Sequence, residues 1–139
     1  MPATTHHALR LRPGQDLRQE LAAFAKTQQL SAAWIVTAVG SLTDCHLRFA
    51  GRDRGFRVSG PFELVSLTGT LSPDGPHLHA CLSDGDGQTI GGHLLDGTLV
   101  YTTCEIVVGA TSAFAFTREL DPASGYAELV VRPASGESR

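Results

Sequence analysis

Three of the six histidines in this chain lie in one stretch, PHLHACLSDGDGQTIGGHL, between Pro76 and Leu94. His77 and His79 are separated by a single residue, and His93 follows after a glycine-rich segment. Neutral imidazole is a good ligand for Zn²⁺, and three protein ligands with one open position are typical of accessible zinc sites. The chemistry of this stretch therefore depends on whether the three imidazoles meet at one point.

Whether they meet depends on the turn between two expected strands. Side chains alternate along a strand, so His77 and His79 point to the same face. A three-residue loop at 85–87, with its last glycine in the left-handed conformation, pairs His79 with His93. A two-residue loop at 85–86 turns His93 to the opposite face, and a bulge at the following Gly-Gly pair would also shift the register. Under the three-residue loop His79 lies between the other two histidines, and we predict a zinc site at all three.

Two carboxylates and one thiol are further candidates for this chemistry. Glu63 stands in the otherwise apolar run FELVSLTGTL, where it is either a general base near the metal or a salt-bridge or subunit-contact residue. Glu105, in TTCEIVV, has the same alternatives. Cys81 shares the face of His77 and His79 in this register, so it is either a fourth ligand or an unreactive thiol.

The segment RFAGRDRGFR forms a basic patch with two aromatic residues among its arginines. Such a pattern can bind single nucleic-acid strands or phosphates, although an exposed hairpin tip also carries solvated arginines. The candidate nucleic-acid residues are Arg48, Arg52, Arg54 and Arg57. The net charge of −3 argues against a domain whose main function is to coat phosphate backbones, because such binding needs clustered Lys and Arg.

The elements that must position these residues follow from the hydrophobic pattern. The stretch DLRQELAAFAKTQQL has an apolar face at helical spacing, which predicts a helix from about Asp16, its N-cap, to Gln29. β-branched or alternating runs bounded by glycine and proline predict strands elsewhere. We expect them at 7–12, 32–42, 62–71, 77–83, 88–94, 97–109, 113–120 and 126–132, with two more around the Gly-Arg-Asp-Arg-Gly turn within 44–58.

One helix and seven or more strands joined by short turns predict an α+β fold with a largely antiparallel sheet. The strand at 32–42 is almost wholly apolar, which predicts burial on both faces and an end at Gly40-Ser41. Asp96-Gly97 is typical of a hairpin turn. A small sheet of this kind leaves an edge or a face exposed, and self-association is a natural way to cover it.

Length and composition predict one globular domain over residues 1–139, since 42% of the residues are hydrophobic and 18% are charged. The residues 133–139, PASGESR, are expected to form a disordered tail. The N-terminus has no apolar signal segment, no run is long enough to span a bilayer, and the three cysteines are widely spaced. These features predict a cytoplasmic protein with reduced thiols and no membrane partner.

The residues from Gly60 to Gly109 resemble the core of the PPC domain, the "plants and prokaryotes conserved" domain. The resemblance rests on G-x-F-E-L-x-S-L-x-G, followed by H-L-H-A and then by G-G-H-L. The flanks are similar to the family's strand–helix–strand opening and closing hairpin, so the resemblance extends over a core of about residues 7–132.

This resemblance implies a strongly bent, mainly antiparallel sheet with one or a few helices, and assembly into homotrimers. In plants the domain follows AT-hook motifs in nuclear proteins and mediates self-association and contacts with other factors. The present sequence has no Arg-Gly-Arg-Pro core and resembles the stand-alone prokaryotic type. Some of those members resemble metal-binding proteins and keep the histidines at 77, 79 and 93, whereas others carry a DNA-binding label by analogy with the plant proteins.

The residues and the resemblance support three hypotheses for function. The first is a trimeric module that binds zinc or a small ligand through His77, His79 and His93. The second is a DNA-binding or regulatory interaction protein, with weak contacts to DNA or to other regulatory proteins. The third is a metal-dependent hydrolase or lyase in which metal-bound water is the nucleophile and Glu63 is the catalytic candidate. We expect the first, a binding module rather than an enzyme.

Overall fold

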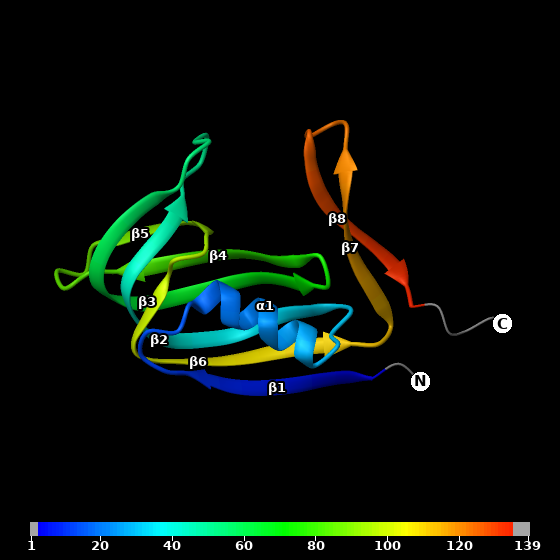
Figure 1. Ribbon diagram of the computed structural model, residues 1–139, viewed down its shortest axis with the longest axis horizontal. Coiled ribbons are helices and arrows are strands. Elements are labelled where there is room, and N and C mark those ends of the chain that lie inside the picture. Colours follow the sequence, from blue (N-terminus) through cyan, green and yellow to red (C-terminus); the bar gives the residue numbers. More distant parts are fainter. Residues whose placement is uncertain (1–2, 135–139) are drawn as a thin grey trace.

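The computed structural model describes residues 3–134, which form one helix and eight strands. In chain order the elements are β1 (Thr4–Leu11), α1 (Leu17–Thr27), β2 (Ala33–Arg48), β3 (Phe56–Ser72), β4 (Gly75–Ser83), β5 (Thr89–Leu94), β6 (Leu99–Thr111), β7 (Phe114–Asp121) and β8 (Tyr126–Pro133). The predicted α+β class, with a bent antiparallel sheet and one main helix, is confirmed (Figure 1). The predicted helix begins at the observed N-cap, Asp16, and ends one residue beyond the observed C-cap, Gln28.

Six strands form one antiparallel sheet in the order β1-β6-β2-β3-β4-β5, and the end of β2 also pairs with β5. The strands β2, β3, β4 and β5 therefore form a closed ring of pairings, which curls that part of the sheet. The remaining two strands, β7 and β8, form a hairpin that projects from one end of the sheet (Figure 1). The fold thus consists of a curled sheet, one helix and one projecting hairpin.

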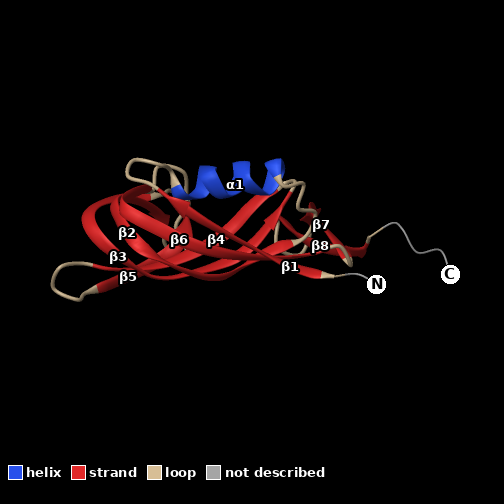
Figure 2. Ribbon diagram, turned by 90° about the horizontal axis from the view of Figure 1, so that it is seen from below, coloured by secondary structure: helices blue, strands red, loops and turns tan. Residues whose placement is uncertain are grey.

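The helix α1 covers one face of the sheet (Figure 2). Its apolar stripe, Leu17, Leu21 and Ala25, is buried in a core cluster together with strand residues such as Leu42 and Val108. Full burial of one leucine stabilises a fold by about 1.5–3 kcal/mol, so this stripe holds the helix on the sheet. Within the described residues, no helix has the length and apolarity that a membrane crossing requires.

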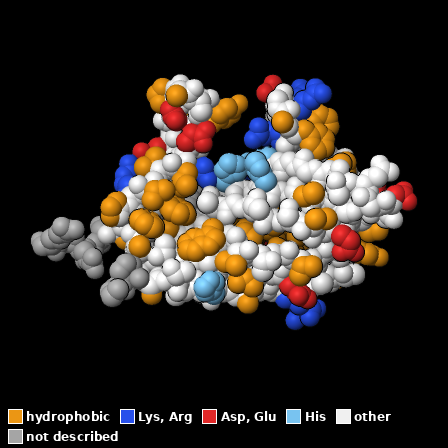
Figure 3. Space-filling model, turned by 180° about the vertical axis from the view of Figure 1, so that it is seen from behind, with side chains coloured by type: hydrophobic (Ala, Val, Ile, Leu, Met, Phe, Trp, Pro, Cys, Tyr) orange, Lys and Arg blue, Asp and Glu red, His pale blue; other side chains and the backbone are white. Residues whose placement is uncertain are grey.

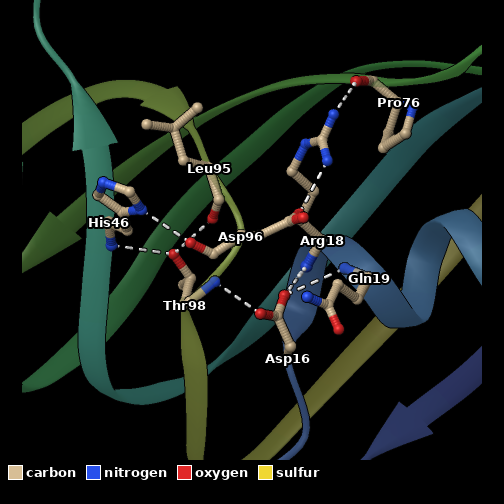
Figure 4. A network of polar contacts seen from close by, with 9 residues as sticks. Asp16, Arg18, Gln19, His46, Pro76, Leu95, Asp96 and Thr98 are labelled. Atoms are coloured by element: carbon tan, nitrogen blue, oxygen red, sulfur yellow. Dashed lines mark hydrogen bonds and ion pairs between the residues drawn. The ribbon is translucent and has the colours of Figure 1, made fainter. Parts of the chain in front are cut away.

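A polar network ties the start of α1 to the connection between β5 and β6 (Figure 4). The Asp16 carboxylate caps the helix by accepting from the backbone N–H groups of Arg18 and Gln19, both at 3.1 Å, and it also accepts from that of Gly97 at 2.6 Å. The Arg18 guanidinium pairs with Asp96 at 2.8 Å. The prediction of a hairpin turn at Asp96-Gly97 is wrong, because the segment crosses between two strands that do not pair and binds the helix cap instead.

The strand β2 differs from its prediction in two respects. It continues past Gly40-Ser41 to Arg48, because a bulge after Leu42 joins it to the next predicted strand. It is not buried on both faces, since Val36 and Val39 are 49% and 58% exposed. The reason is that α1 covers only one face of the sheet, so an apolar strand keeps its other face exposed in the single chain.

The β7–β8 hairpin extends one residue into the segment that was expected to be a disordered tail. Pro133 is the last residue of β8, and the Ala134 N–H donates to the Ala113 carbonyl at 3.0 Å. The rest of the expected tail, 135–139, lies outside the described residues. Pairing with β7 therefore fixes the chain as far as its last described residues.

Gly69 lies in β3 opposite Leu78, where the two backbones approach closely. Its φ is +143°, and a Cβ added there would overlap the His77 carbonyl oxygen. We predict that Gly69→Ala lowers the free energy of unfolding by about 2 kcal/mol or more, because the new side chain meets both backbone strain and a steric clash. Urea denaturation followed by circular dichroism measures the change.

The matched control is Gly85→Ala, since a Cβ at that loop position meets nothing within 4 Å. We expect it to change the free energy of unfolding by no more than about 0.5 kcal/mol. Equal stabilities of the two variants would show that the backbones of β3 and β4 do not approach as closely as described.

Candidate metal centre

The loop between β4 and β5 has the three-residue form. The Asp84 N–H donates to the Gln88 carbonyl at 2.9 Å, and the Gly87 N–H donates to the Asp84 carbonyl at 3.0 Å. Gly87 has a φ of +78°, in the left-handed region that glycine adopts without steric cost. The predicted register is confirmed, because His79 pairs directly with His93.

The imidazoles of His77, His79 and His93 surround a common point. Their ring centroids are 5.2 Å apart for the first and second, 5.1 Å for the first and third, and 5.5 Å for the second and third. One nitrogen of each ring lies within 4.8 Å of the others. The expectation that His79 lies between the other two is wrong. The rings form a nearly equilateral triangle, because side chains lean along the strand from their Cα atoms.

The cluster fits a metal ion in donor type and spacing. Tetrahedral Zn–N bonds of 2.0–2.1 Å place ligand nitrogens about 3.3 Å apart, so ring rotations that move each nitrogen by about 1 Å would complete the geometry. His93 Nδ1 is buried and has no hydrogen-bond partner among residues 3–134. A buried polar nitrogen without a hydrogen-bond partner costs free energy, and an ion bound at this cluster would supply the missing partner.

Burial and nearby charges favour the neutral form of two of the three imidazoles, those of His77 and His93. Burial lowers the pKa of His93 to about 4, with further contributions from the Arg48 guanidinium and the neighbouring histidines. Burial also lowers the pKa of His77, and Arg118 acts in the same direction while Glu128 opposes it. Since a neutral imidazole carries the lone pair that binds a metal, these two side chains are in their ligating form at neutral pH.

The cluster borders a cavity of about 410 Å³ between the sheet and the β7–β8 hairpin. Figure 3 shows histidine side chains at the bottom of a hollow between two projecting parts of the molecule. His79 faces a smaller depression beside Thr68 and Gly69. The residues around the larger cavity are Arg18, Arg48, Asp74, Gly75, Pro76, His77, His93, Arg118, Tyr126, Ala127 and Glu128.

Sequence patterns do not identify four charged residues of this cavity, which are Arg18, Asp74, Arg118 and Glu128. The backbone N–H of Arg118 donates to the Asp74 carboxylate at 2.8 Å, and the Arg118 guanidinium donates to the Thr70 hydroxyl at 3.1 Å. These bonds fix the hairpin beside the histidines. The residues come from α1, the β3–β4 turn and the hairpin, so no local spacing could have placed them with the cluster.

The carboxylates suggested by the sequence lie elsewhere. Glu63 pairs with Ser83, four residues along β4 from His79, which corresponds to about 13 Å at the rise of a strand. Glu105 pairs with Val39 and is exposed. Within one chain, neither side chain reaches the three histidines, so neither can act as a base there.

The cysteines take no part in the cluster. Cys81 does not belong to the group of ligand atoms that lie within 4.8 Å of one another. Burial raises the pKa of Cys45 and of Cys104 to about 12, so both thiols stay protonated and unreactive. All three cysteines are free thiols.

The predicted basic patch is divided between two places. Arg48 pairs with His93 in the β2–β5 register and lines the cavity. Arg52 and Arg54 lie exposed in the turn between β2 and β3, and Arg57 is exposed on β3. The structure therefore groups Arg48 with the histidines rather than with the other three arginines.

Fold and site together define a class of protein, a curled antiparallel-sheet domain with three converging histidines beside a hairpin-lined cavity. The sequence profile of the Plants and Prokaryotes Conserved (PCC) domain, written PPC above, matches residues 1–112. The chain belongs to this family, as its motifs predicted. The matched region ends before β7, so the projecting hairpin lies beyond it.

Solved structures share the fold of this chain. A hypothetical protein from Salmonella enterica is 44% identical with a TM-score of 0.92, and the match covers 96% of each chain. A metal-containing protein from Archaeoglobus fulgidus is 26% identical with a TM-score of 0.77, and the match covers 91% of this chain and 93% of the other.

A curated relative, the bifunctional protein GlmU of Synechococcus sp. (strain JA-2-3B'a(2-13)), is 47% identical over 131 residues. The match covers 94% of this chain but only 21% of GlmU, so this chain spans about a fifth of the length of that relative.

We predict that the metal-free protein loses stability as the pH falls from about 6.5 to about 4. Histidine in the unfolded chain titrates near 6.5, whereas His93 in the folded protein titrates at about 4. Between these values the unfolded state binds more protons, so the stability that is fully present above 6.5 is progressively lost. Urea unfolding at a series of pH values, in the presence of a chelator, measures this dependence.

The control for this experiment is His93→Gln, which removes the titrating group and keeps a polar side chain. Its free energy of unfolding should fall less steeply than that of the wild type over the same pH interval. Parallel curves for the two proteins would contradict the lowered pKa.

Proposed function

We propose that this chain is a metal-binding domain in which His77, His79 and His93 hold one Zn²⁺ ion. The observation that carries the proposal is the convergence of one nitrogen from each imidazole within 4.8 Å. A zinc ion held by three imidazoles keeps a coordination position open, where it acts as a Lewis acid or activates water. The relative from Archaeoglobus fulgidus, which is described as metal-containing, supports the proposal.

A metal-dependent hydrolase or lyase is the second candidate, because the cavity contains a carboxylate suited to proton transfer. Two carboxylates line the cavity, Asp74 and Glu128. Asp74 already accepts the Arg118 N–H, whereas Glu128 is half-buried and acts electrostatically on His77. Glu128 therefore replaces Glu63 as the residue that would serve as a base at this site.

The DNA-binding hypothesis has less support from the arrangement of charge. With Arg48 in the cavity, Arg52, Arg54 and Arg57 are left as the exposed arginines of the predicted patch. Nucleic-acid affinity grows with the number of phosphates that a surface neutralises, and the chain as a whole carries a net charge of −3. These charges suit at most weak binding that depends strongly on salt.

We also propose that the domain assembles with copies of itself, as a homotrimer. The exposed large apolar residues Val36, Val39, Val65 and Tyr101, on β2, β3 and β6, are 48% to 58% exposed. Leu9, Val107 and Ile106 surround a further apolar hollow next to Val39. An apolar sheet surface of this kind is typical of a face that another subunit covers.

We predict that protein purified without an affinity tag binds one equivalent of Zn²⁺ and that His79→Ala lowers the affinity by about tenfold or more. A three-ligand site that loses one imidazole loses a full coordination bond, and the triangular geometry predicts similar losses for His77→Ala and His93→Ala. Mass-spectrometric metal analysis and competition with a chromophoric chelator measure content and affinity. The bound metal should be released only below the usual histidine pKa, because burial keeps His77 and His93 neutral.

His6→Ala serves as the control, since His6 is exposed on β1 and does not belong to the cluster. Its affinity for Zn²⁺ should equal that of the wild type. If the wild type bound no zinc, or if the His6 and His79 variants bound it equally, the metal proposal would be wrong.

We predict that Val39→Asp shifts the protein from trimer to monomer, because a charge on an apolar contact face has to be desolvated on association. Light scattering coupled to size-exclusion chromatography measures the mass. Val131→Asp is the control, as Val131 is 51% exposed but lies on β8 of the projecting hairpin. A wild type of monomer mass at micromolar concentration would rule out the assembly.

A further inference from the structure

The cavity beside the histidines contains an unusual group of arginines. Of the arginines within residues 3–134, only Arg18, Arg48 and Arg118 are half-buried, and all three line this one cavity. Every other described arginine is exposed. Guanidinium groups gathered around one hollow create a positive potential that attracts anions, so three of them around one cavity call for an explanation.

Only one of the three has such a partner in the protein. Arg18 pairs with Asp96 at 2.8 Å and also donates to the Pro76 carbonyl at 3.3 Å. Among the described residues, the Arg48 guanidinium makes no hydrogen bond or ion pair, and that of Arg118 donates only to the neutral hydroxyl of Thr70. The positive charges of Arg48 and Arg118 are therefore left without a carboxylate.

These two arginines lie next to the cluster on two different sides. Arg48 stands directly opposite His93 in the β2–β5 pairing. The guanidinium of Arg118, on β7, donates to the hydroxyl of Thr70, which stands directly opposite His77 in the β3–β4 pairing. Their two guanidinium groups thus approach the proposed metal position from the sheet and from the hairpin.

The cavity carboxylates do not neutralise this pair. Neither Asp74 nor Glu128 forms an ion pair with Arg48 or Arg118 within 4.0 Å among the described residues, and Asp74 accepts the Arg118 backbone N–H instead. A divalent ion at the histidines adds two further positive charges to the same region. An anion that touched both the ion and the arginines would offset part of this positive charge.

The size of the cavity limits what this anion can be. A volume of about 410 Å³ falls at the lower end of the range for small-molecule sites. The planar fork of a guanidinium matches a carboxylate or a phosphate group, to which it can donate two parallel N–H bonds. A small metabolite with one such group fits a space of this size.

Building on the proposed metal site, we infer that this cavity binds a small organic anion that bridges the metal and the two arginines. One oxygen of the ligand coordinates the ion, and its carboxylate or phosphate group accepts N–H bonds from Arg48 and Arg118. The ligand is recognised by charge and by an oxygen positioned near the anionic group, as in a 2-hydroxycarboxylate.

The experiment uses the full chain, without an affinity tag, loaded with Co²⁺ in place of Zn²⁺. The visible absorption of Co²⁺ reports its coordination, so it registers both metal binding and ligand binding at the metal. The probes are glycolate, its neutral analogue glycolamide, and inorganic phosphate. We expect glycolate or phosphate to change the spectrum in a saturable way, and glycolamide to bind at least about tenfold more weakly because it lacks the charge.

The arginine variants test the second half of the inference. Arg48→Met and Arg118→Met should each weaken binding of the anion by about tenfold or more, the loss expected for one charge-assisted hydrogen bond. Their Co²⁺ affinity should not fall. Arg54→Met is the matched control, because Arg54 is exposed in the β2–β3 turn and should leave anion binding unchanged. If either methionine variant is poorly folded, Arg48→Lys or Arg118→Lys replaces it. Lysine keeps the charge but lacks the planar fork that donates two parallel N–H bonds, so anion binding should still weaken.

The outcomes separate this inference from the proposal on which it rests. A wild type that binds no Co²⁺ would overturn the metal site and the bridging anion together. Normal Co²⁺ binding, with anions that bind nowhere or bind equally to the Arg48 and Arg54 variants, would overturn the anion site alone. Arginine-dependent binding of glycolate but not phosphate would identify a carboxylate ligand, and the reverse would identify a phosphate.

Discussion

The backbone of Gly87 controls where His93 points. At a φ of +78° this glycine lets the β4–β5 loop close on Asp84 and Gln88, which sets His79 opposite His93. A register slip of one residue turns all side chains of a strand to the other face. The sheet would then separate the histidines. The convergence of the imidazoles therefore depends on a loop that contains none of them.

The cavity adds a second constraint, which comes from charge. Burial is the main cause of the lowered pKa values of His77 and His93. Arg48 lowers both values further and Arg118 lowers that of His77, and the same guanidinium groups also oppose a metal cation at those residues. Binding of a metal and binding of an anion would then favour each other, because each ligand offsets the charge that disfavours the other. The hairpin contributes Arg118 to this balance, so its position beside the sheet matters as much as the histidines themselves.

The one-sided cover of the sheet links the fold to assembly. The helix buries one face of the sheet, and the network around Asp16 anchors that helix to the β5–β6 connection. The other face keeps apolar residues such as Val39 exposed. The histidine cavity and this apolar surface then belong to one continuous sheet, which the β2–β5 pairing curls.

The sequence by itself determined the elements and much of the cluster. Local signals, namely the apolar helical face, the alternating strands and the glycine pattern of one loop, act between residues close in the chain, and they predicted α1, the strands and the pairing of His79 with His93. The failures were of longer range. The sequence did not show that β2 runs through a bulge, that Asp96-Gly97 crosses between strands, or that Glu63 lies far from the cluster.

Only the tertiary structure decided the surroundings of the histidines. Arg48 joins them because β2 curls back onto β5, and Arg118 and Glu128 join them because the hairpin stands beside the sheet. The burial and charge that lower the pKa values of His77 and His93 come from these contacts. Such contacts join residues far apart in the chain, and their positions are set by packing of whole elements, which no spacing within a short stretch encodes.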